Sequence, residues 1–358
     1  MASRRRKPNR VYGGLVNAAR PAALDTAVST LPPGYFALVM ATGIVGAGLE
    51  TAGLTAAAGA LTAIAVVAYV VLVVLTGWRL VVWRDRMRED FMSARNGFLF
   101  YTFVAATCVL GTRLVDVVGP WWALGFLAVG LIGWIVLGYA IPWWVVVEGG
   151  AGRSLEGVNG TWFVWPVASQ SCAVLAATLE VRIDELAQLL SIVAILFWGI
   201  GVVLYGVIGV AVVMRFLMFG IEPEQLGPPY WIAMGAASIS VFAGALIVDM
   251  TGTPMASVTQ GLIGGASVLF WAFASWLIPA LLLIGWWRHV ARRVPLAYDP
   301  AYWSMVFPLG MYAVASIHLG EADRLPIVGA IGAAFLWVAV LAWVLVFVAT
   351  GLSLVRRR

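Results

Sequence analysis

Charged residues are scarce in this chain. Asp, Glu, Lys and Arg make up 11% of its 358 residues, whereas they make up about a quarter of a soluble globular domain. Hydrophobic residues account for 62% of the chain, and the mean hydropathy is +0.96. The longest polar stretch is the first 30 residues, which leaves no room for a soluble domain between the apolar segments. The composition therefore predicts an integral membrane protein.

Cysteine and histidine are rare, with two of each. Cys108 and Cys172 each lie well inside an apolar segment, where a thiol more often fills space than forms a disulfide or binds a metal. The sequence contains no HExxH, CxxC or GxSxG motif and no glycine-rich phosphate loop with a lysine. We therefore expect neither an enzyme nor a resident metal or cofactor.

Buried carboxylates are also scarce. Glu148, Glu180, Asp249 and Glu321 fall at the ends of apolar segments, although a proton or sodium relay usually needs ionisable groups within the membrane. This pattern disfavours tight ion coupling. Asp249 and His318, both expected near the outer face, keep a coupled carrier as an alternative.

The basic residues predict the orientation in the membrane. Nineteen of the 22 Lys and Arg lie on the side of the N-terminus, and Arg113, Arg182 and Arg324 lie on the other side. Because cytoplasmic loops are enriched in Lys and Arg, we expect both termini in the cytoplasm of a cell-membrane protein. Residues 1–30 form a basic cytoplasmic arm, and residues 355–358 a cytoplasmic C-terminus. The net charge of +5 thus indicates contact with anionic lipid and no nucleic-acid partner.

Ten apolar segments between residues 31 and 354 are each long enough to cross a hydrocarbon layer of about 30 Å. The expected fold is all-α, with ten transmembrane helices in one pore domain. The segments are approximately residues 34–50, 54–83, 97–114, 120–147, 159–178, 187–219, 230–250, 257–290, 301–319 and 326–354.

An internal repeat divides these segments into pairs. Every odd-numbered segment opens with a small residue or proline and an aromatic residue. The anchors Phe36, Phe98, Trp162, Trp231 and Trp303 are separated by 62, 64, 69 and 72 residues. A repeat of this length holds two membrane helices. We therefore expect five helical hairpins arranged around a central axis.

The odd-numbered segments are shorter and are rich in glycine, proline, serine and threonine. In a membrane helix, small and polar residues of this kind face protein or water. The odd-numbered helices would therefore line a central pore, and the more hydrophobic even-numbered helices would face lipid. Close helix packing is the alternative explanation for the small residues. The pore-lining candidates are Phe36, Thr42, Gly43, Thr161, Trp162, Pro166, Ser169, Gly235, Ser238, Ser304 and Pro308.

The predicted direction of the odd helices favours anions. All five begin on the cytoplasmic side, where each helix N-terminus carries roughly half a positive charge. Together with the basic loops, these ends would concentrate anions at the inner mouth. No arginine is expected within the membrane that could hold a dicarboxylate.

Four segments resemble the tellurite-resistance/dicarboxylate transporter family, which includes bacterial TehA, the plant slow-type anion channels and fungal malate and sulfite transporters. The most specific are residues 31–43 (LPPGYFALVMATG) and 302–312 (YWSMVFPLGMY). Residues 160–168 (GTWFVWPVA) and 230–235 (YWIAMG) are weaker matches. The resemblance covers about residues 31–354.

The resemblance implies five hairpins with quasi-fivefold symmetry, a pore lined by the odd helices, and a homotrimer. It also implies that Phe307, at the family's Phe-Pro position, closes the pore. The expected partners are small inorganic or organic anions and the lipid bilayer. A small-anion channel or uniporter is the leading expectation. The alternatives are a secondary carrier of C4-dicarboxylates, sulfite or tellurite, with or without proton coupling, and a non-transporting membrane scaffold.

Overall fold

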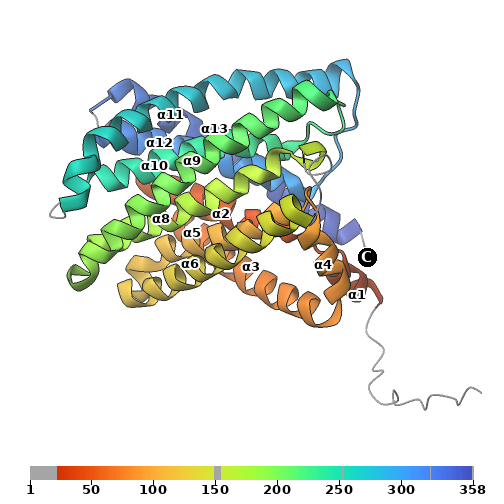
Figure 1. The fold of residues 1–358 in the computed structure, drawn as a ribbon, viewed down its shortest axis with the longest axis horizontal. Coiled ribbons are helices and arrows are strands. Elements are labelled where there is room, and N and C mark those ends of the chain that lie inside the picture. The colour runs from red at the N-terminus through yellow and green to blue at the C-terminus, as the bar shows by residue number, and fades with distance from the viewer. Residues whose placement is uncertain (1–21, 149–154, 251–253, 323, 357–358) are drawn as a thin grey trace, which may run out of the picture.

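The structure is a computed structural model that describes residues 22–148, 155–250, 254–322 and 324–356, and these residues form helices and no strand (Figure 1). Ten of the helices form five consecutive hairpins. The first helix of each hairpin is α2 (Ala37–Thr51), α5 (Tyr101–Val118), α8 (Val164–Glu180), α10 (Ile232–Val248) or α12 (Trp303–Ala322). The second is α3 (Thr55–Val82), α6 (Pro120–Pro142), α9 (Ala187–Phe219), α11 (Pro254–Trp286) or α13 (Pro326–Arg356).

The first helices of the five hairpins form a closed ring. Helix α2 contacts α5, α5 contacts α8, α8 contacts α10, α10 contacts α12, and α12 contacts α2 again. We call these five the inner helices. Each second helix packs on its own inner helix and on the inner helix of the next hairpin, and α13 reaches α2 to complete the circuit. These five are the outer helices.

A short 3₁₀ turn precedes every inner helix. The five turns are Pro33–Phe36, Gly97–Phe100, Gly160–Phe163, Pro228–Trp231 and Pro300–Tyr302. They hold four of the five aromatic anchors, and the fifth, Trp303, begins α12. The turns contact one another in the same cyclic order as the inner helices. We call this end of the molecule the turn face, and the opposite end, with the hairpin loops 52–54 and 181–183, the loop face.

The turns pack closely enough to require glycine at one position. A Cβ atom added to Gly160 would lie 2.5 Å from the backbone carbonyl carbon of Pro229. Backbone cannot move aside as a flexible side chain can, so only glycine fits between these two turns. The turn itself is capped by Asn159, whose side chain accepts a hydrogen bond of 2.8 Å from the Thr161 amide.

Burial separates the inner helices from the outer ones. In the segment that contains the inner helix α8, 89% of the most apolar 18-residue stretch is buried. The same share is 11% in the segment that contains the outer helix α11. Large apolar side chains on the outer helices face outward, including Leu217 on α9 and Val258 on α11. An apolar surface of this kind is typical of helices that face lipid.

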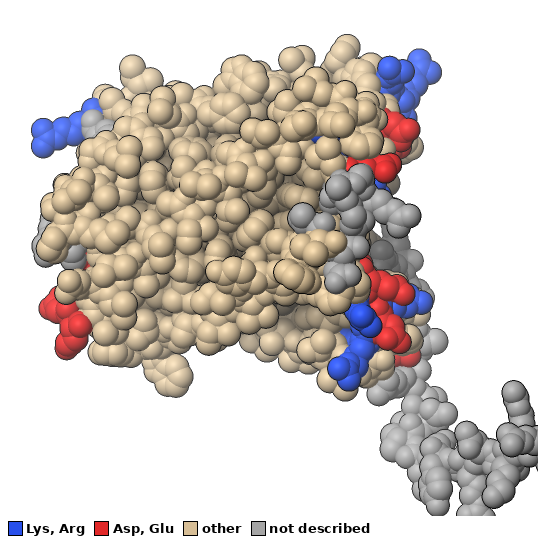
Figure 2. All heavy atoms as spheres, in the orientation of Figure 1, with Lys and Arg blue, Asp and Glu red and all other residues tan. Residues whose placement is uncertain are grey.

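Nine helices in the described part of the chain are long and apolar enough to cross a membrane. The inner helix α12 is absent from this group because Pro308, Tyr312 and His318 make it less apolar. On the face of the molecule shown in Figure 2, Lys, Arg, Asp and Glu of the described residues gather at the two ends, and the band of surface between the ends shows none of them. This band matches the expected all-α integral membrane protein.

Two short helices lie outside the hairpins, near the turn face. Helix α1 (Ala22–Ser29) contacts α3 and belongs to the predicted N-terminal arm, whose residues 1–21 are outside the described part. Helix α4 (Arg84–Met92) is highly charged and had not been predicted. The guanidinium of Arg79 on α3 binds its Asp90 carboxylate at 2.6 Å, which holds α4 against the end of α3.

Candidate functional site

Hydrogen bonds join each hairpin to the next one around the ring. In every case an aromatic side chain of an outer helix meets a serine or threonine on the inner helix of the following hairpin. The five pairs are Tyr69 hydroxyl with Thr107 hydroxyl (2.8 Å), Trp134 indole with Ser169 hydroxyl (2.7 Å), Trp198 indole with Ser240 carbonyl (3.0 Å), Trp271 indole with Ser316 hydroxyl (2.9 Å) and Trp343 indole with Thr42 hydroxyl (3.0 Å). Part of the polar content of the inner helices therefore fixes the ring itself.

A central cavity lies inside the ring and is lined by all five inner helices. Its volume is about 70 Å³. Its lining is mainly apolar, and its polar side chains are Thr112, Arg113 and Ser171. Among the described residues, no carboxylate lines it. The lining residues are Gly43, Ile44, Ala47, Val109, Thr112, Arg113, Ser171, Val174, Ile239, Phe242 and Met311.

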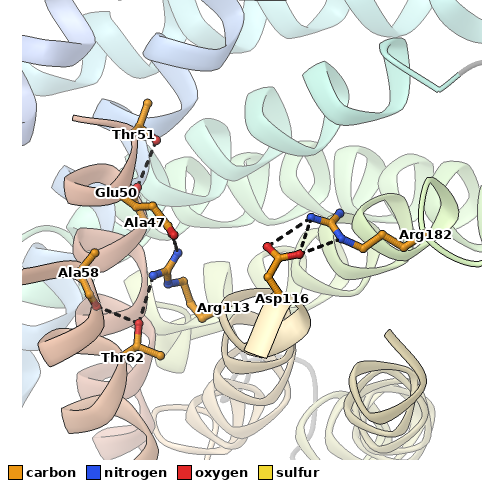
Figure 3. A network of polar contacts seen from close by, with 8 residues as sticks. All are labelled: Ala47, Glu50, Thr51, Ala58, Thr62, Arg113, Asp116 and Arg182. Atoms are coloured by element: carbon orange, nitrogen blue, oxygen red, sulfur yellow. Dashed lines mark hydrogen bonds and ion pairs between the residues drawn. The ribbon is translucent and has the colours of Figure 1, made fainter. Parts of the chain in front are cut away.

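Arg113 brings a positive charge to the cavity. It lies near the C-terminal end of α5, and its guanidinium donates hydrogen bonds to the carboxylate of Glu50 and to the hydroxyl of Thr62, the latter at 3.1 Å (Figure 3). The side chain is 12% exposed. The sequence predicts Arg113 on the outer side of the membrane, inside the segment expected at residues 97–114. In the structure Arg113 lies in α5, which runs to Val118, and borders the central cavity.

Phe307 lies on the turn-face side of this cavity. Met311 lines the cavity, and Phe307 precedes it by four residues, which places the two side chains on the same face of α12 one turn apart. The Phe307 side chain is buried, with 2% exposure. Its neighbour Pro308 packs against α10, where an added Cβ on Gly235 would come within 2.8 Å of the proline ring.

The remaining candidates occupy different places. Among the predicted pore-lining residues, Gly43 lines the central cavity. Ser238 precedes the cavity residue Phe242 by one helical turn and is buried. Thr42 and Ser169 direct their hydroxyls to tryptophans of outer helices. Pro166 and Ser304 are buried in α8 and α12.

Three candidates belong to the turns. The ring of Phe36 contacts Tyr69 and Phe103 edge to face, with centroids 6.0 and 5.4 Å away. Thr161 donates a hydrogen bond to the Arg95 carbonyl at 3.0 Å. Trp162 stacks on Phe98 with a centroid distance of 4.3 Å and donates to the Ala94 carbonyl.

The two cysteines meet at the contact between α5 and α8. The Sγ atoms of Cys108 and Cys172 are 3.7 Å apart, and both thiols are free and buried. Across the described ranges, no three His, Cys, Asp or Glu side chains gather as a possible metal site.

Comparison with known proteins identifies the family to which this chain belongs. The family model for SLAC1, described as a voltage-dependent anion channel, matches residues 30–351. The chain belongs to the SLAC1 family. The match covers nearly the whole membrane region and confirms the resemblance found in the four sequence segments. SLAC1-family membership makes the chain an anion transporter of the membrane, with no catalytic site required.

Relatives of this SLAC1-family chain include both close and distant proteins. An uncharacterized membrane protein of Mycobacterium tuberculosis (strain H37Rv) is 54% identical over 146 residues, which cover 41% of this chain and 74% of that protein. An uncharacterized transporter of Methanocaldococcus jannaschii is 23% identical over 90% of this chain and 93% of its own length. A sulfite efflux pump of Arthroderma benhamiae is 24% identical over 90% and 91%.

Proposed function

We propose that this protein is a small-anion channel or uniporter whose pathway runs through the centre of each protomer, between the five inner helices. The cavity lined by all five inner helices carries this proposal. It lies inside a closed ring, and the described residues that line it include Arg113 and no carboxylate. A pathway of this kind selects by size and by electrostatic potential, and here the potential favours anions.

The proposed pathway is closed at Phe307. A benzyl group in a narrow passage offers no hydrogen bond to an anion that must lose water, so conduction requires the ring to move. The burial of Phe307 and its position one turn from the cavity support this role.

In this proposal α12 crosses the membrane with the other nine helices, and the ten helices have quasi-fivefold symmetry.

Pore lining beyond the cavity is also proposed. Gly43 and Ser238 have the strongest support, since one lines the cavity and the other shares a helix face with a cavity residue. Gly235 and Pro308 would shape the closed segment between α10 and α12, where they pack together. Ser304 lies nearly one turn before Phe307 and would face the same segment.

A secondary carrier is the second candidate. The relatives named sulfite efflux pumps support it, because an efflux pump moves its substrate against a gradient. Sulfite, with four heavy atoms, is small enough for a cavity of about 70 Å³. A C4-dicarboxylate has about nine heavy atoms and would require a wider conformation. Coupling to protons is the feature that separates this candidate from a channel.

We further propose that the turn face and both chain ends lie in the cytoplasm of a cell membrane, since the basic residues concentrate on that side. The family resemblance favours a homotrimer with one pathway in each protomer. Neither proposal affects the route through the central cavity.

Anion flux through reconstituted protein tests the function. Purified protein in liposomes should pass chloride, nitrate or sulfite down an imposed gradient, and a membrane potential should accelerate the flux. A channel gives flux that a pH gradient leaves unchanged, whereas a proton-coupled carrier gives saturable flux that follows the pH gradient. Protein that folds and inserts but passes no anion would support the scaffold alternative.

A further inference from the structure

We propose that Arg113 forms an anion-recognition site at the loop-face end of the central cavity, and that its ligand is a small inorganic anion. This inference rests on the proposed function and assigns the group that recognises the permeating ion. Arg113, together with Thr112, lines both the central cavity and a larger cleft toward the loop face.

The location of Arg113 between two cavities is the first observation. Thr112 and Arg113 line the central cavity, and both also line a larger cleft of about 480 Å³ that is bordered by α3 and α5. Glu50 and Asp116 line the outer cleft but not the central cavity. The guanidinium therefore borders both spaces, whereas these two carboxylates border the outer cleft.

The unused donor of Arg113 is the second observation. One Nη atom donates to Glu50 and the other to Thr62. The Nε–H group is buried and has no hydrogen-bond partner among the described residues. A buried donor without a partner is costly, and an anion in the cavity would supply the missing acceptor. A charge-assisted bond of this kind is about twice as strong as a neutral one.

The side chain of Arg113 lies along α2. A Cβ atom on Gly43 would be 3.7 Å from Arg113 Cγ, and one on Gly46 would be 3.9 Å from its Nε, which are ordinary van der Waals distances. Thr62 and Glu50 then fix the guanidinium plane from α3 and from the end of α2 (Figure 3).

The charge of this site is not cancelled by its ion pair. The side chain of Glu50 is 55% exposed, whereas that of Arg113 is 12% exposed. Water screens the exposed carboxylate much more than the buried guanidinium, so the cavity retains a positive potential. The nearby Asp116 does not neutralise Arg113, because its carboxylate binds Arg182 at 3.1 Å (Figure 3).

The size of the cavity defines the class of ligand. About 70 Å³ is the volume of about two waters in the liquid, which suits a halide or a small oxyanion of about four atoms. One free N–H and one positive charge recognise a single acceptor atom. A dicarboxylate would need a second basic group, and Arg113 is the one Arg among the residues lining the cavity.

Chloride flux at increasing chloride concentrations tests this site in proteoliposomes. Arg113→Gln shortens the side chain and removes the charge, and it should raise the half-saturating chloride concentration about tenfold, as expected for a lost charge-assisted hydrogen bond. Arg113→Lys should lie much closer to the wild type. Glu50→Gln should lower the half-saturating concentration, since it removes the neutralising carboxylate.

Arg182→Gln is the matched control, because it breaks an exposed ion pair on the same face without touching the cavity. It should leave the half-saturating concentration unchanged. If Arg113→Gln passes chloride with the same half-saturating concentration as the wild type, this inference is overturned and the proposed function stands. If Arg113→Gln does not fold, Glu50→Gln decides: an unchanged or raised value overturns the inference. A wild type that passes no anion overturns both proposals.

Discussion

At the scale of single residues, the inner helices use their serine and threonine side chains for two purposes. Thr112 and Ser171 reach the central cavity, whereas Thr42 and Ser169 bind tryptophans of neighbouring hairpins. The sequence predicts that such residues face protein or water, but it does not distinguish the two, because the partner tryptophan of Thr42 lies 301 residues away.

Thr42→Val should destabilise the protein, because it removes the acceptor and leaves the Trp343 indole N–H unpaired in a buried site. We expect a loss of about 1 kcal/mol in the free energy of unfolding, measured by thermal or denaturant unfolding in detergent. Thr51→Val is the control, since Thr51 is exposed at the end of the same helix and bonds only to the Ala47 carbonyl of its own helix.

A double-mutant cycle with Trp343→Phe isolates this pair. If the hydrogen bond is what matters, the second substitution should cost little once the first is present. Equal, additive losses in both backgrounds would show that Thr42 and Trp343 contribute independently.

At the scale of helices, hydropathy predicts most of the architecture. The segment expected at residues 187–219 is helix α9 with the same bounds, and the aromatic anchors mark the 3₁₀ turns. Hydropathy succeeds because a membrane helix must be long and apolar. It missed α4, whose charged residues give no hydropathy signal, and the position of Arg113 beside the central cavity, which depends on how α5 packs against its neighbours.

Thiol labelling tests which helices face the pathway. In a background with both native cysteines replaced, Ala47→Cys on α2 and Val174→Cys on α8 should react with small water-soluble thiol reagents, because both positions line the cavity. Leu217→Cys on α9 and Val258→Cys on α11 should stay unmodified, since lipid covers these outward positions. Equal reaction at all four sites, with protein intact by size-exclusion chromatography, would rule out an inner ring around water.

At the scale of the whole molecule, five hairpins form a ring that is continuous in helix contacts, in its 3₁₀ turns and in its tryptophan and tyrosine hydrogen bonds. Such a closed arrangement keeps a central space without exposing backbone to lipid. On the face shown in Figure 2, charged side chains lie at the two ends and an uncharged surface lies between them, as expected for a protein that spans a membrane. The repeat of five anchors predicted this ring, whereas the cavity and its closure depend on side-chain packing that periodicity does not define.

The central claim is that anions pass through this ring and that Phe307 closes it. Current and thermal stability measured on the same Phe307→Ala preparation test it most directly. Phe163→Ala is the matched control, because Phe163 is equally buried but packs on the ring of Tyr205, 5.3 Å away on an outer helix. Phe163→Ala should lose about 3–5 kcal/mol of stability and gain no current.

Phe307→Ala should raise the anion current several-fold over the wild type, because it removes the ring that fills the closed passage. A wild-type current combined with a drop in melting temperature like that of Phe163→Ala would show that Phe307 is a packed core residue, and would contradict the account.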